Sequence, residues 1–583
     1  MPPDEMRALI LTILVLPLAA GIAVAALGPR RLVAVRWIAL AAVVVNLLLT
    51  GVLVGDAAAV LRKPGKDLNT FRPEFVPGDP GEDQKQPNGT VKRGDSHTTA
   101  WDLLPLGRSR DARPAAIRFY LGLDGLNIWL IALTSLLMVP SVLVSWNSVK
   151  ERANEFYAWL LVLQTGMLGV FLAFDIVIFY VFFELTLVPL FFLIGIWGGP
   201  ARREAARKFF LFTFAGSLVT LLGMIGLIVA VYQKTAVLTF AIPELVELVQ
   251  TQLAVQNPET AAWWREVQFY VFLALCAGFA IKVPLFPLHT WLPLAHVEAP
   301  TAGSVLLAGV LLKLGTYGFL RLCLPLTPDA VLSVGVPLIG TLAVIGIFYG
   351  SFCAYAQRDI KKMVAYSSVA HLGFCVLGLF ALNAAGIAGG LMQMINHGLS
   401  TGGLFLLVGM LYERYHTRMM GDYGGLGARL KLLSLSMVFI CLSSVGMPFL
   451  NGFIGEMLIL AGVMDLRVSP GWAWAFSIAG AAGLVLGAWY LFTMLKNVFF
   501  GPLKEPHHDP NEGPVLDLDL RELATLIPVG LCCLAIGIYP QPMLRSTERD
   551  VGVVSRICDQ ARARAAAPAP AVAQSPTPPT DTR

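Results

Sequence analysis

Charged residues are scarce in this sequence. Only 14% of its 583 residues are Asp, Glu, Lys or Arg, about half the share found in soluble domains. So few charged side chains could not cover the surface of a soluble protein of this length. Apolar residues make up 56% of the chain, and 55 glycines add to them. The composition therefore excludes a soluble enzyme of several domains and indicates an integral membrane protein.

Cysteine is also rare, with eight residues and no CxxC or Cys/His spacing of a metal site. This count excludes a secreted disulfide scaffold and argues against an iron–sulfur or structural zinc site. No GxGxxG follows a strand, and no strands are evident, so nothing indicates that the chain itself binds NADH. The net charge of +5 is small, and nucleic-acid binding has no support. We expect no cofactor and no metal in this chain.

Fourteen apolar stretches are long enough to cross a membrane as helices of about 20 residues. They lie near residues 8–27, 33–55, 125–146, 157–174, 175–197, 209–232, 268–296, 301–321, 330–353, 363–382, 384–412, 432–464, 472–495 and 523–540. Because their number is even, both ends of the chain are expected on the same side. The predicted fold class is an all-α polytopic membrane protein with about fourteen transmembrane helices.

Lysine and arginine in the short connections indicate which side that is. If the termini lie outside, the inner connections hold most of these residues, for example the four in 202–208. An excess of Lys and Arg is typical of cytoplasmic connections. We therefore expect a multi-pass protein of the inner (plasma) membrane with both termini on the outer side. Lys361 and Lys362 are fully explained by this rule as loop charges.

Residues 56–118 and 541–583 stand apart from the apolar body. The first region is polar and rich in turn residues, and we expect a partly disordered outer loop. The second becomes Arg-rich and then rich in Ala and Pro, which predicts a disordered tail. The other expected units are two N-terminal helices at 1–55, a core at 119–500, and a loop with the last helix at 501–540.

Ionisable side chains inside the apolar stretches carry most of the functional information. Each costs at least about 2.5–3.5 kcal/mol at the bilayer centre unless it faces a cavity or a partner. The candidates are Glu184, Lys282, Lys313, His371, His397 and Glu456. Because apolar residues could have replaced all of them, we interpret them as a polar path.

A purely structural role is the alternative for these residues. Each charge could pair with a neighbour and only fix the register of its helix. His371 and His397 could each be a hydrogen-bonded core histidine. His289 and His296 are interpreted at least as well as interfacial polar residues.

Two of the stretches contain helix breakers beside their charges. Pro284 and Pro287 follow Lys282, and the segment SSVGMPFLNG (443–452) precedes Glu456. Proline removes a backbone donor and clashes with the preceding turn, so both helices should be interrupted near mid-membrane. These are the seventh and twelfth stretches, and their odd offset means that the two helices cross the membrane in opposite directions.

This pattern predicts two inverted five-helix repeats, at about 157–321 and 330–495, each with one discontinuous helix. The chemistry suits protons, because desolvation weakens the hold of a lysine on its proton and a nearby carboxylate strengthens it. Moving Glu184 relative to Lys282 could therefore make the lysine take up or release a proton. Histidines are suited to relay protons near neutral pH.

Six segments together resemble the chain M family of respiratory complex I, the proton-translocating NADH:quinone oxidoreductase. The resemblance covers about residues 120–500 and is carried by LDGLNIWLIALT (123–134), FFELTLVPLFFLIGIWGG (182–199), KVPLFPLHTWLPLAHVEAPTAGSVLLAGVLLKLG (282–315), DIKKMVAYSSVAHLGF (359–374), HGLSTGGLFLLVGMLYERYHTR (397–418) and NGFIGEMLIL (451–460). It implies an antiporter-like membrane subunit of a redox-driven proton pump.

The resemblance also implies roles and partners. Glu184 would pair with Lys282, whose proton would pass to Lys313, through the region of His371 and His397, and out by Glu456. NADH, FMN, iron–sulfur clusters and quinone would belong to partner subunits. The neighbours in the membrane would be the antiporter-like chains L and N, and the remaining surface would face lipid.

One departure from the family pattern stands at the end of the seventh stretch. The family usually has WLPDAH, and this chain has Leu294 in place of the aspartate, which puts a proton-entry role there in doubt, although Glu298 lies nearby. Two alternatives remain open: a subunit of a sodium/proton antiporter or membrane-bound hydrogenase, and a chain that only scaffolds its neighbours. The retained set of buried charges disfavours the scaffold.

Overall fold

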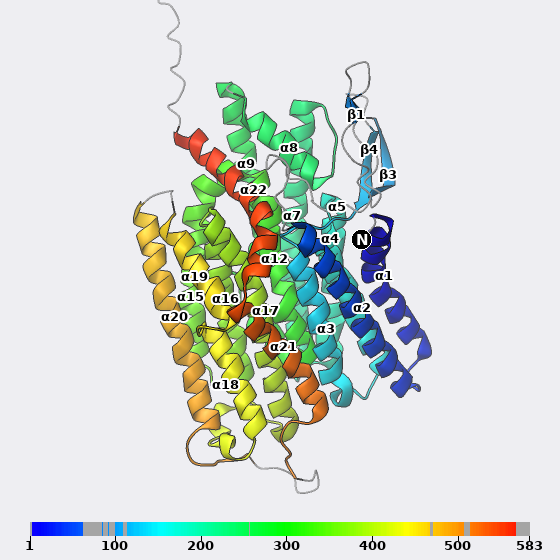
Figure 1. Ribbon diagram of the computed structural model, residues 1–583, viewed down its shortest axis with the longest axis vertical. Helices are drawn as coiled ribbons and strands as arrows, with labels where there is room; N and C mark the ends of the chain where they lie inside the picture. Colours follow the sequence, from blue (N-terminus) through cyan, green and yellow to red (C-terminus); the bar gives the residue numbers. More distant parts are fainter. Residues whose placement is uncertain are drawn as a thin grey trace, which may run out of the picture.

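The computed structural model of the protein describes residues 3–61, 84–85, 91–92, 100–108, 114–255, 257–466, 470–506 and 514–566. Long helices packed side by side make up most of it (Figure 1). The predicted polytopic all-α fold is confirmed. Thirteen helical segments in this part of the chain are long and apolar enough to cross a membrane. The shorter apolar helices α18 and α19 together supply the remaining crossing.

The crossings follow the chain in order. They are α1 (Pro3–Leu27), α2 (Leu32–Leu61), α3 (Ile128–Ser148), α4 (Ala153–Leu172), α5 (Ile176–Leu185) with α6 (Leu187–Trp197), α7 (Arg202–Thr235), α9 (Pro258–Lys282) with α10 (Trp291–Glu298), then the run α11 (Thr301–Leu306), η1 (Leu307–Leu311), α12 (Leu312–Gly318), η2 (Phe319–Cys323) and α13 (Leu324–Leu326), the run α14 (Pro328–Ala330), η3 (Val331–Gly340) and α15 (Thr341–Tyr355), then α16 (Ile360–Leu379), α17 (Ala384–Tyr415), α18 (Lys431–Val445) with α19 (Asn451–Met464), α20 (Pro470–Phe499) and α21 (Leu520–Ile538). The elements outside the crossings are α8 (Ile242–Leu253), η4 (Met420–Asp422), η5 (Leu426–Ala428), α22 (Gln541–Ala566) and the strands β1 (Gln84–Lys85), β2 (Val91–Lys92), β3 (Ala100–Arg108) and β4 (Pro114–Tyr120).

Both predicted helix interruptions are present. The seventh crossing stops at the end of α9 and resumes at α10, and the twelfth stops at the end of α18 and resumes at α19. Gly446 ends α18 with a φ of +79°, a left-handed conformation that glycine adopts without a Cβ clash. The two predicted five-helix repeats therefore each contain one discontinuous helix.

Two segments form the interior of the bundle. The most apolar 18-residue window of Thr301–Leu326, and likewise that of Ala384–Tyr415, is completely buried. Part of the first segment, η1, is a π-helix, and such segments occur frequently at functional sites. Lys313 and His397 thus lie on the two crossings that are farthest from lipid.

A β-hairpin corrects the expectation of a strandless outer loop. β3 and β4 pair antiparallel, with Trp101 opposite Phe119. The backbone N–H of Arg118 donates to Asp175 Oδ2 at 3.0 Å, which ties the hairpin to the start of α5. The apolar strands were hidden because the surrounding polar sequence dominated the composition. Most of the predicted loop, 62–83 and 93–99 included, lies outside the described residues.

The prediction of a disordered tail is wrong for residues 541–566. They form α22, which packs against α2, α13, α14 and α17 (Figure 1, red). Its buried residues include Val551, Val554 and Cys558, which share one helix face. Alternating Arg and Ala lowered the hydropathy and concealed this face. Residues 567–583 lie outside the described part of the chain.

A buried ion pair joins the start of α3 to the eighth crossing. Arg321, which is fully buried, donates to both carboxylate oxygens of Asp124, at 2.5 and 2.7 Å. Its Nε also donates to the hydroxyl of Tyr317 at 2.9 Å. Asp124 accepts two further bonds, from the backbone N–H groups of Leu126 and Asn127. The bidentate geometry and these additional bonds are what a buried pair needs to offset its desolvation.

We expect Arg321→Met to destabilise the protein by about 3–5 kcal/mol, because it leaves the Asp124 carboxylate buried without its cation. The double variant Asp124→Asn/Arg321→Met should recover a large part of that loss. Thermal unfolding of the detergent-solubilised protein measures both. Equal losses in the single and double variants would contradict a pair held by its charges.

Candidate functional site

The six candidate residues lie in two groups. Lys313, His371, His397 and Glu456 come together where η1, α12, α16, α17 and α19 pack, and all four are buried. Glu184 and Lys282 lie at neighbouring helix ends in the first repeat.

Lys282 is the last residue of α9 and is only 3% exposed. Its Nζ donates to Thr186 Oγ1 at 3.3 Å and stands 4.5 Å from the ring centre of Phe183. Thr186 lies at the junction between α5 and α6, where the helix is interrupted. The ammonium group is therefore held by a hydroxyl and an aromatic face.

Glu184 lies between these two contacts of Lys282 in the sequence, but the predicted ion pair is not formed. Oε1 of Glu184 is buried and has no hydrogen-bond partner among the described residues. The side chain as a whole is half-buried. The carboxylate thus stands near the lysine without neutralising it, so the pairing of Glu184 with Lys282 remains a prediction.

Lys313 contacts a backbone carbonyl of its own crossing and a histidine of α17. Its Nζ donates to the backbone carbonyl of Ala308, inside the π-helix η1, and lies 2.7 Å from His397 Nδ1. Gly309 and Gly398 allow this approach, because a Cβ on Gly398 would lie 2.8 Å from the carbonyl oxygen of Gly309. The hydrogen bond joins the first repeat to the second.

From His397 the polar groups continue to His371. The centres of the two rings are 5.6 Å apart. Nε2 of His371 lies 3.3 Å from the Tyr490 hydroxyl and 3.4 Å from the Ser444 hydroxyl. Nε2 of His397 is buried and has no hydrogen-bond partner within the described structure.

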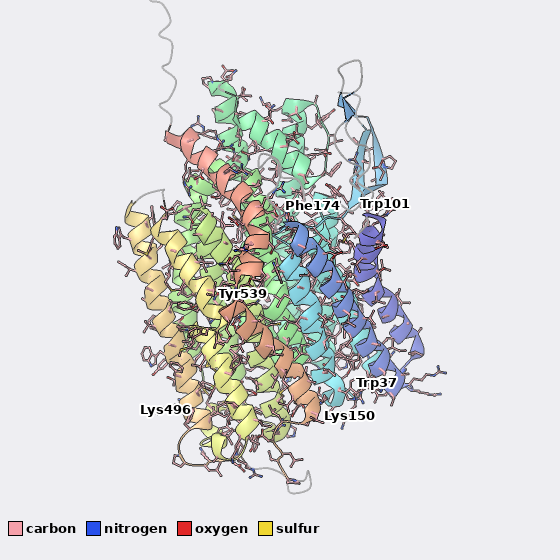
Figure 2. All side chains as sticks on the ribbon, viewed as in Figure 1. Trp37, Trp101, Lys150, Phe174, Lys496 and Tyr539 are labelled. Carbon is pink, nitrogen blue, oxygen red and sulfur yellow. The ribbon has the colours of Figure 1, made fainter. Side chains whose placement is uncertain are left out.

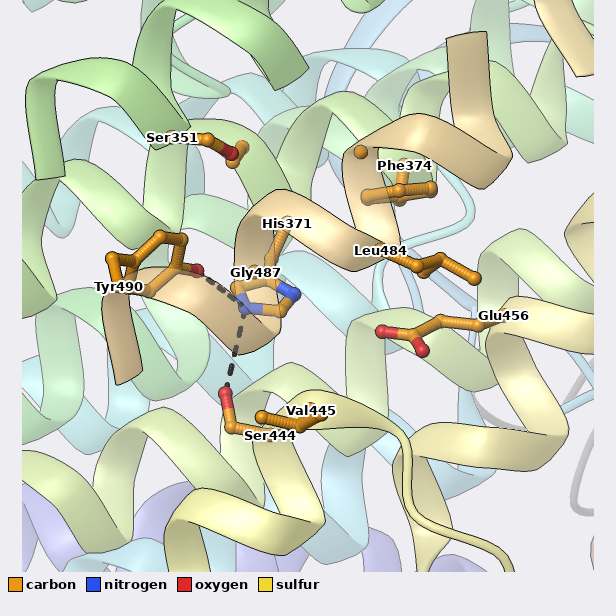
Figure 3. A pocket seen from close by; sticks show the side chains of 11 residues that line it. Ser351, His371, Phe374, Ser444, Val445, Glu456, Leu484, Gly487 and Tyr490 are labelled. Atoms are coloured by element: carbon orange, nitrogen blue, oxygen red, sulfur yellow. Dashed lines mark hydrogen bonds between the residues drawn. The ribbon is translucent and has the colours of Figure 1, made fainter. Parts of the chain in front are cut away.

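Glu456 and His371 line one small cavity, shown in Figure 3. The cavity has room on the order of one water molecule. Oε1 of Glu456 accepts a hydrogen bond from Gln393 Nε2 at 3.3 Å. Among the described residues this carboxylate forms no ion pair, so it stands buried without a cation. Burying an unpaired carboxylate is costly unless it carries a proton.

A network of uncharged polar side chains surrounds the second helix interruption, and sequence reasoning missed it. Asn396 Nδ2 donates to the backbone carbonyl of Asn451 at 2.8 Å and to Gln393 Oε1 at 3.3 Å. Ser443 donates to Asn451 Oδ1 at 2.5 Å. The signal was available in QMINHGLS (393–400), where Gln393, Asn396 and His397 share one face of an otherwise apolar helix.

Three residues set aside in the sequence are buried here, His289, His296 and Lys361. His296, interpreted as an interfacial residue, is fully buried, and both ring nitrogens lack a partner in the described structure. Its ring stacks on Phe405 at 4.6 Å. Lys361, interpreted as a loop charge, lies in the first turn of α16 and donates to the Ala299 carbonyl at 2.6 Å. The sequence placed Lys361 in a connection, whereas α16 begins one residue before it.

The carboxylate of Glu298, at the end of the seventh crossing, binds a backbone N–H group of a neighbouring helix. Glu298 Oε2 accepts a hydrogen bond from the backbone N–H of Ala201 at 2.8 Å, next to the start of α7. Leu294 is half-buried.

Within the described residues there is no group of three or more His, Cys, Asp or Glu side chains that could hold a metal ion.

We expect Gly446→Ala to displace Glu456, because an added Cβ would overlap Oε2 of that carboxylate at a position that also needs a positive φ. Because the resemblance implies that Glu456 transfers protons, we expect proton pumping to fall several-fold. Gly226→Ala is the matched control, since its Cβ would meet nothing within 4 Å. Proton pumping by membrane vesicles measures the difference, and equal activity of the two variants would contradict the packing of Gly446 against Glu456.

Comparison with known proteins places this geometry in a family. Residues 173–483 match the family model described as NADH:quinone oxidoreductase/Mrp antiporter, transmembrane. The chain is 41% identical over 434 residues to NADH-quinone oxidoreductase subunit M of Pseudomonas aeruginosa, covering 73% of this chain and 80% of that protein. It is 39% identical over 445 residues to the subunit M of Escherichia coli K12, covering 76% and 83%.

Solved structures agree with the sequence comparisons. A chain in the structure of respiratory complex I from Thermus thermophilus with bound NADH superposes with a TM-score of 0.74 at 27% identity, covering 94% of this chain and 99% of that one. A chain of the Mrp complex from Dietzia sp. gives a TM-score of 0.73 at 17% identity, covering 96% and 99%, and shows a shared fold alone. From the matching residues 173–483 and from these relatives, the chain belongs to the NADH:quinone oxidoreductase/Mrp antiporter transmembrane family.

Proposed function

We propose that this chain is a proton-translocating membrane subunit of NADH:quinone oxidoreductase. The observation that carries the proposal is the buried series Lys313, His397, His371 and Glu456, in which each member lies beside the next through a hydrogen bond, a ring contact or a shared cavity. All four groups can take up and release a proton. The names of the relatives at about 40% identity support the assignment to this enzyme.

The contrast with the Asp124–Arg321 pair argues against a scaffold. That pair has charges that neutralise each other at bidentate distance. Lys313 has no such partner among the described residues, and its Nζ contacts only a carbonyl and an imidazole nitrogen. A buried charge that only fixed helix register would be expected to carry its counter-charge.

Lys282 and Glu184 supply the first half of the proposed path. The eighth crossing packs tightly against the end of α9, since a Cβ on Gly315 would lie 2.6 Å from Val283 Cγ2 and 3.0 Å from the Phe279 carbonyl oxygen. Lys282 precedes Val283, so the two lysines stand on adjoining segments. A proton released by Lys282 would pass toward Lys313 on this adjoining segment, and approach of Glu184 to Lys282 would hold the proton back.

The redox chemistry is assigned to other subunits. We infer that NADH, FMN, iron–sulfur clusters and quinone bind elsewhere in the complex, that this chain carries no redox site, and that chains L and N are its membrane neighbours. Exposed apolar side chains such as Leu222 and Val485 suit contact with lipid. A sodium/proton antiporter subunit is the second candidate, supported by the Mrp-like fold at lower identity.

We expect Lys313→Ala to lower proton pumping several-fold while electron transfer from NADH to an artificial acceptor stays normal. Lys313→Arg should pump almost as poorly, because guanidinium stays protonated and cannot pass its proton on. Proton uptake by inside-out vesicles per NADH oxidised measures this, with the exposed Lys150→Ala as control. Full pumping by the arginine variant would show that Lys313 is a fixed charge. Pumping that requires sodium would favour the antiporter alternative.

The positions of basic residues support an orientation in the membrane. Lys150 and Lys496 lie at one end of the bundle, and Trp101 lies at the other (Figure 2). We infer that the basic end faces the cytoplasm, which puts both termini on the outer side of the inner membrane.

We expect a membrane-impermeant maleimide to label Leu103→Cys, on the exposed hairpin, in right-side-out vesicles, and Lys150→Cys only in inside-out vesicles. The parent chain, with its eight native cysteines, is the control. The reverse pattern would invert the topology.

A further inference from the structure

His371 is held on one side by two hydroxyl groups from two other helices. Tyr490 of α20 and Ser444 of α18 both approach Nε2, at 3.3 and 3.4 Å (Figure 3). Both side chains are buried, with Tyr490 only 1% exposed. Neither residue stood out in the sequence, because tyrosine and serine are common in apolar helices.

Two hydroxyls on one ring nitrogen can serve both protonation states of the ring. A hydroxyl donates one hydrogen bond and also accepts. When His371 is neutral with its proton on Nδ1, a hydroxyl donates to Nε2. When the ring is doubly protonated, the hydroxyls turn and accept from Nε2. A neutral ring with its proton on Nε2 donates to a hydroxyl, so the two hydroxyls hold the orientation of the ring in both neutral tautomers and in the charged form.

The other ring nitrogen faces the cavity that Glu456 lines (Figure 3). Ser351 also lines this cavity, and its hydroxyl is buried without a partner in the described structure. A water in the cavity would have polar partners among the lining groups, which include His371, Ser351 and Glu456. Buried waters typically make about three such bonds.

Resting on the proposed function, we infer that Tyr490 and Ser444 are positioning residues that hold His371 with Nδ1 toward Glu456, so that the proton passes between them through one water. The N–H bond of doubly protonated His371 breaks at Nδ1 and its proton joins the water. The water gives one of its own protons to the Glu456 carboxylate. The step leaves a neutral histidine, a neutral glutamic acid and the same water.

The test removes the hydroxyls one at a time from the assembled complex. Tyr490→Phe keeps the ring and loses the oxygen, and we expect proton pumping per NADH oxidised to fall roughly fivefold, as for the net loss of one hydrogen bond. Ser444→Ala alone should have a smaller effect, because the tyrosine still serves Nε2. The double variant Tyr490→Phe/Ser444→Ala should lower proton pumping by a larger factor than the product of the factors for the two single variants. Tyr157→Phe, at a buried tyrosine far from His371 in the sequence, is the control and should pump normally.

A second pair of variants separates a positioning role of the two hydroxyls from a role in packing alone. In the Tyr490→Phe background, Ser444→Thr keeps a hydroxyl on Nε2 and should retain the activity that Ser444→Ala loses. The titratable groups facing His371 are Lys313, His397, Glu456 and Tyr490, so the pH profile of pumping should also change in Tyr490→Phe and stay unchanged in the control.

Each outcome decides the inference. If Tyr490→Phe assembles poorly, fluorotyrosine at 490 keeps the size and hydroxyl and should still shift the pH profile, and an unshifted profile would overturn the role of Tyr490. Wild-type pumping by the Tyr490→Phe/Ser444→Ala variant would overturn it as well. If Lys313→Ala also pumps normally, the proposed function fails. If Lys313→Ala loses pumping while the double variant does not, only the positioning role fails.

Discussion

The cost of keeping charge inside an apolar bundle governs this structure. The chain meets that cost in two ways. Arg321 and Asp124 neutralise each other at bidentate distance, with Tyr317 and backbone N–H groups completing their hydrogen bonds. Lys282 and Lys313 receive instead a hydroxyl, an aromatic face, a carbonyl and an imidazole. The first arrangement fixes its charges, whereas the second leaves each ammonium group with neutral partners, so that loss of its proton leaves no counter-charge buried without a partner.

Interruptions of the helices supply these neutral partners. In a regular helix the interior carbonyls are already engaged in i→i−4 hydrogen bonds. The π-helix η1 places the Ala308 carbonyl at Lys313, the junction of α5 and α6 places Thr186 at Lys282, and the turn at Gly446 makes room for Glu456. The regular hydrogen bonding of these helices is therefore interrupted at the positions where the titratable groups lie.

The fourteen crossings and the two discontinuous helices were predictable, because length, hydropathy and proline act locally in the sequence. Charge within apolar stretches likewise marked the six titratable candidates, whose roles remain predictions. The hairpin β3–β4 and the helix α22 were not predictable. Their apolar stretches are short or interrupted by polar residues, and their apolar side chains are buried only by packing on other segments. The contacts of His371 with Ser444 and Tyr490 were also beyond reach: they join three helices, and no local pattern specifies which hydroxyl meets which nitrogen. Lys361 and His296 could not be recognised as buried for the same reason. A segment distant in the sequence buries each of them, and the adjacent residues give no sign of that contact.

The link between the two repeats follows from their packing. Lys313 belongs to the last crossing of the first repeat and His397 to the third crossing of the second, and their 2.7 Å contact depends on the close approach of Gly309 and Gly398. A hydrogen bond weakens steeply when its atoms separate by a few tenths of an ångström beyond about 3.2 Å. Any movement that slides one repeat against the other therefore changes this contact far more than it changes contacts within either repeat.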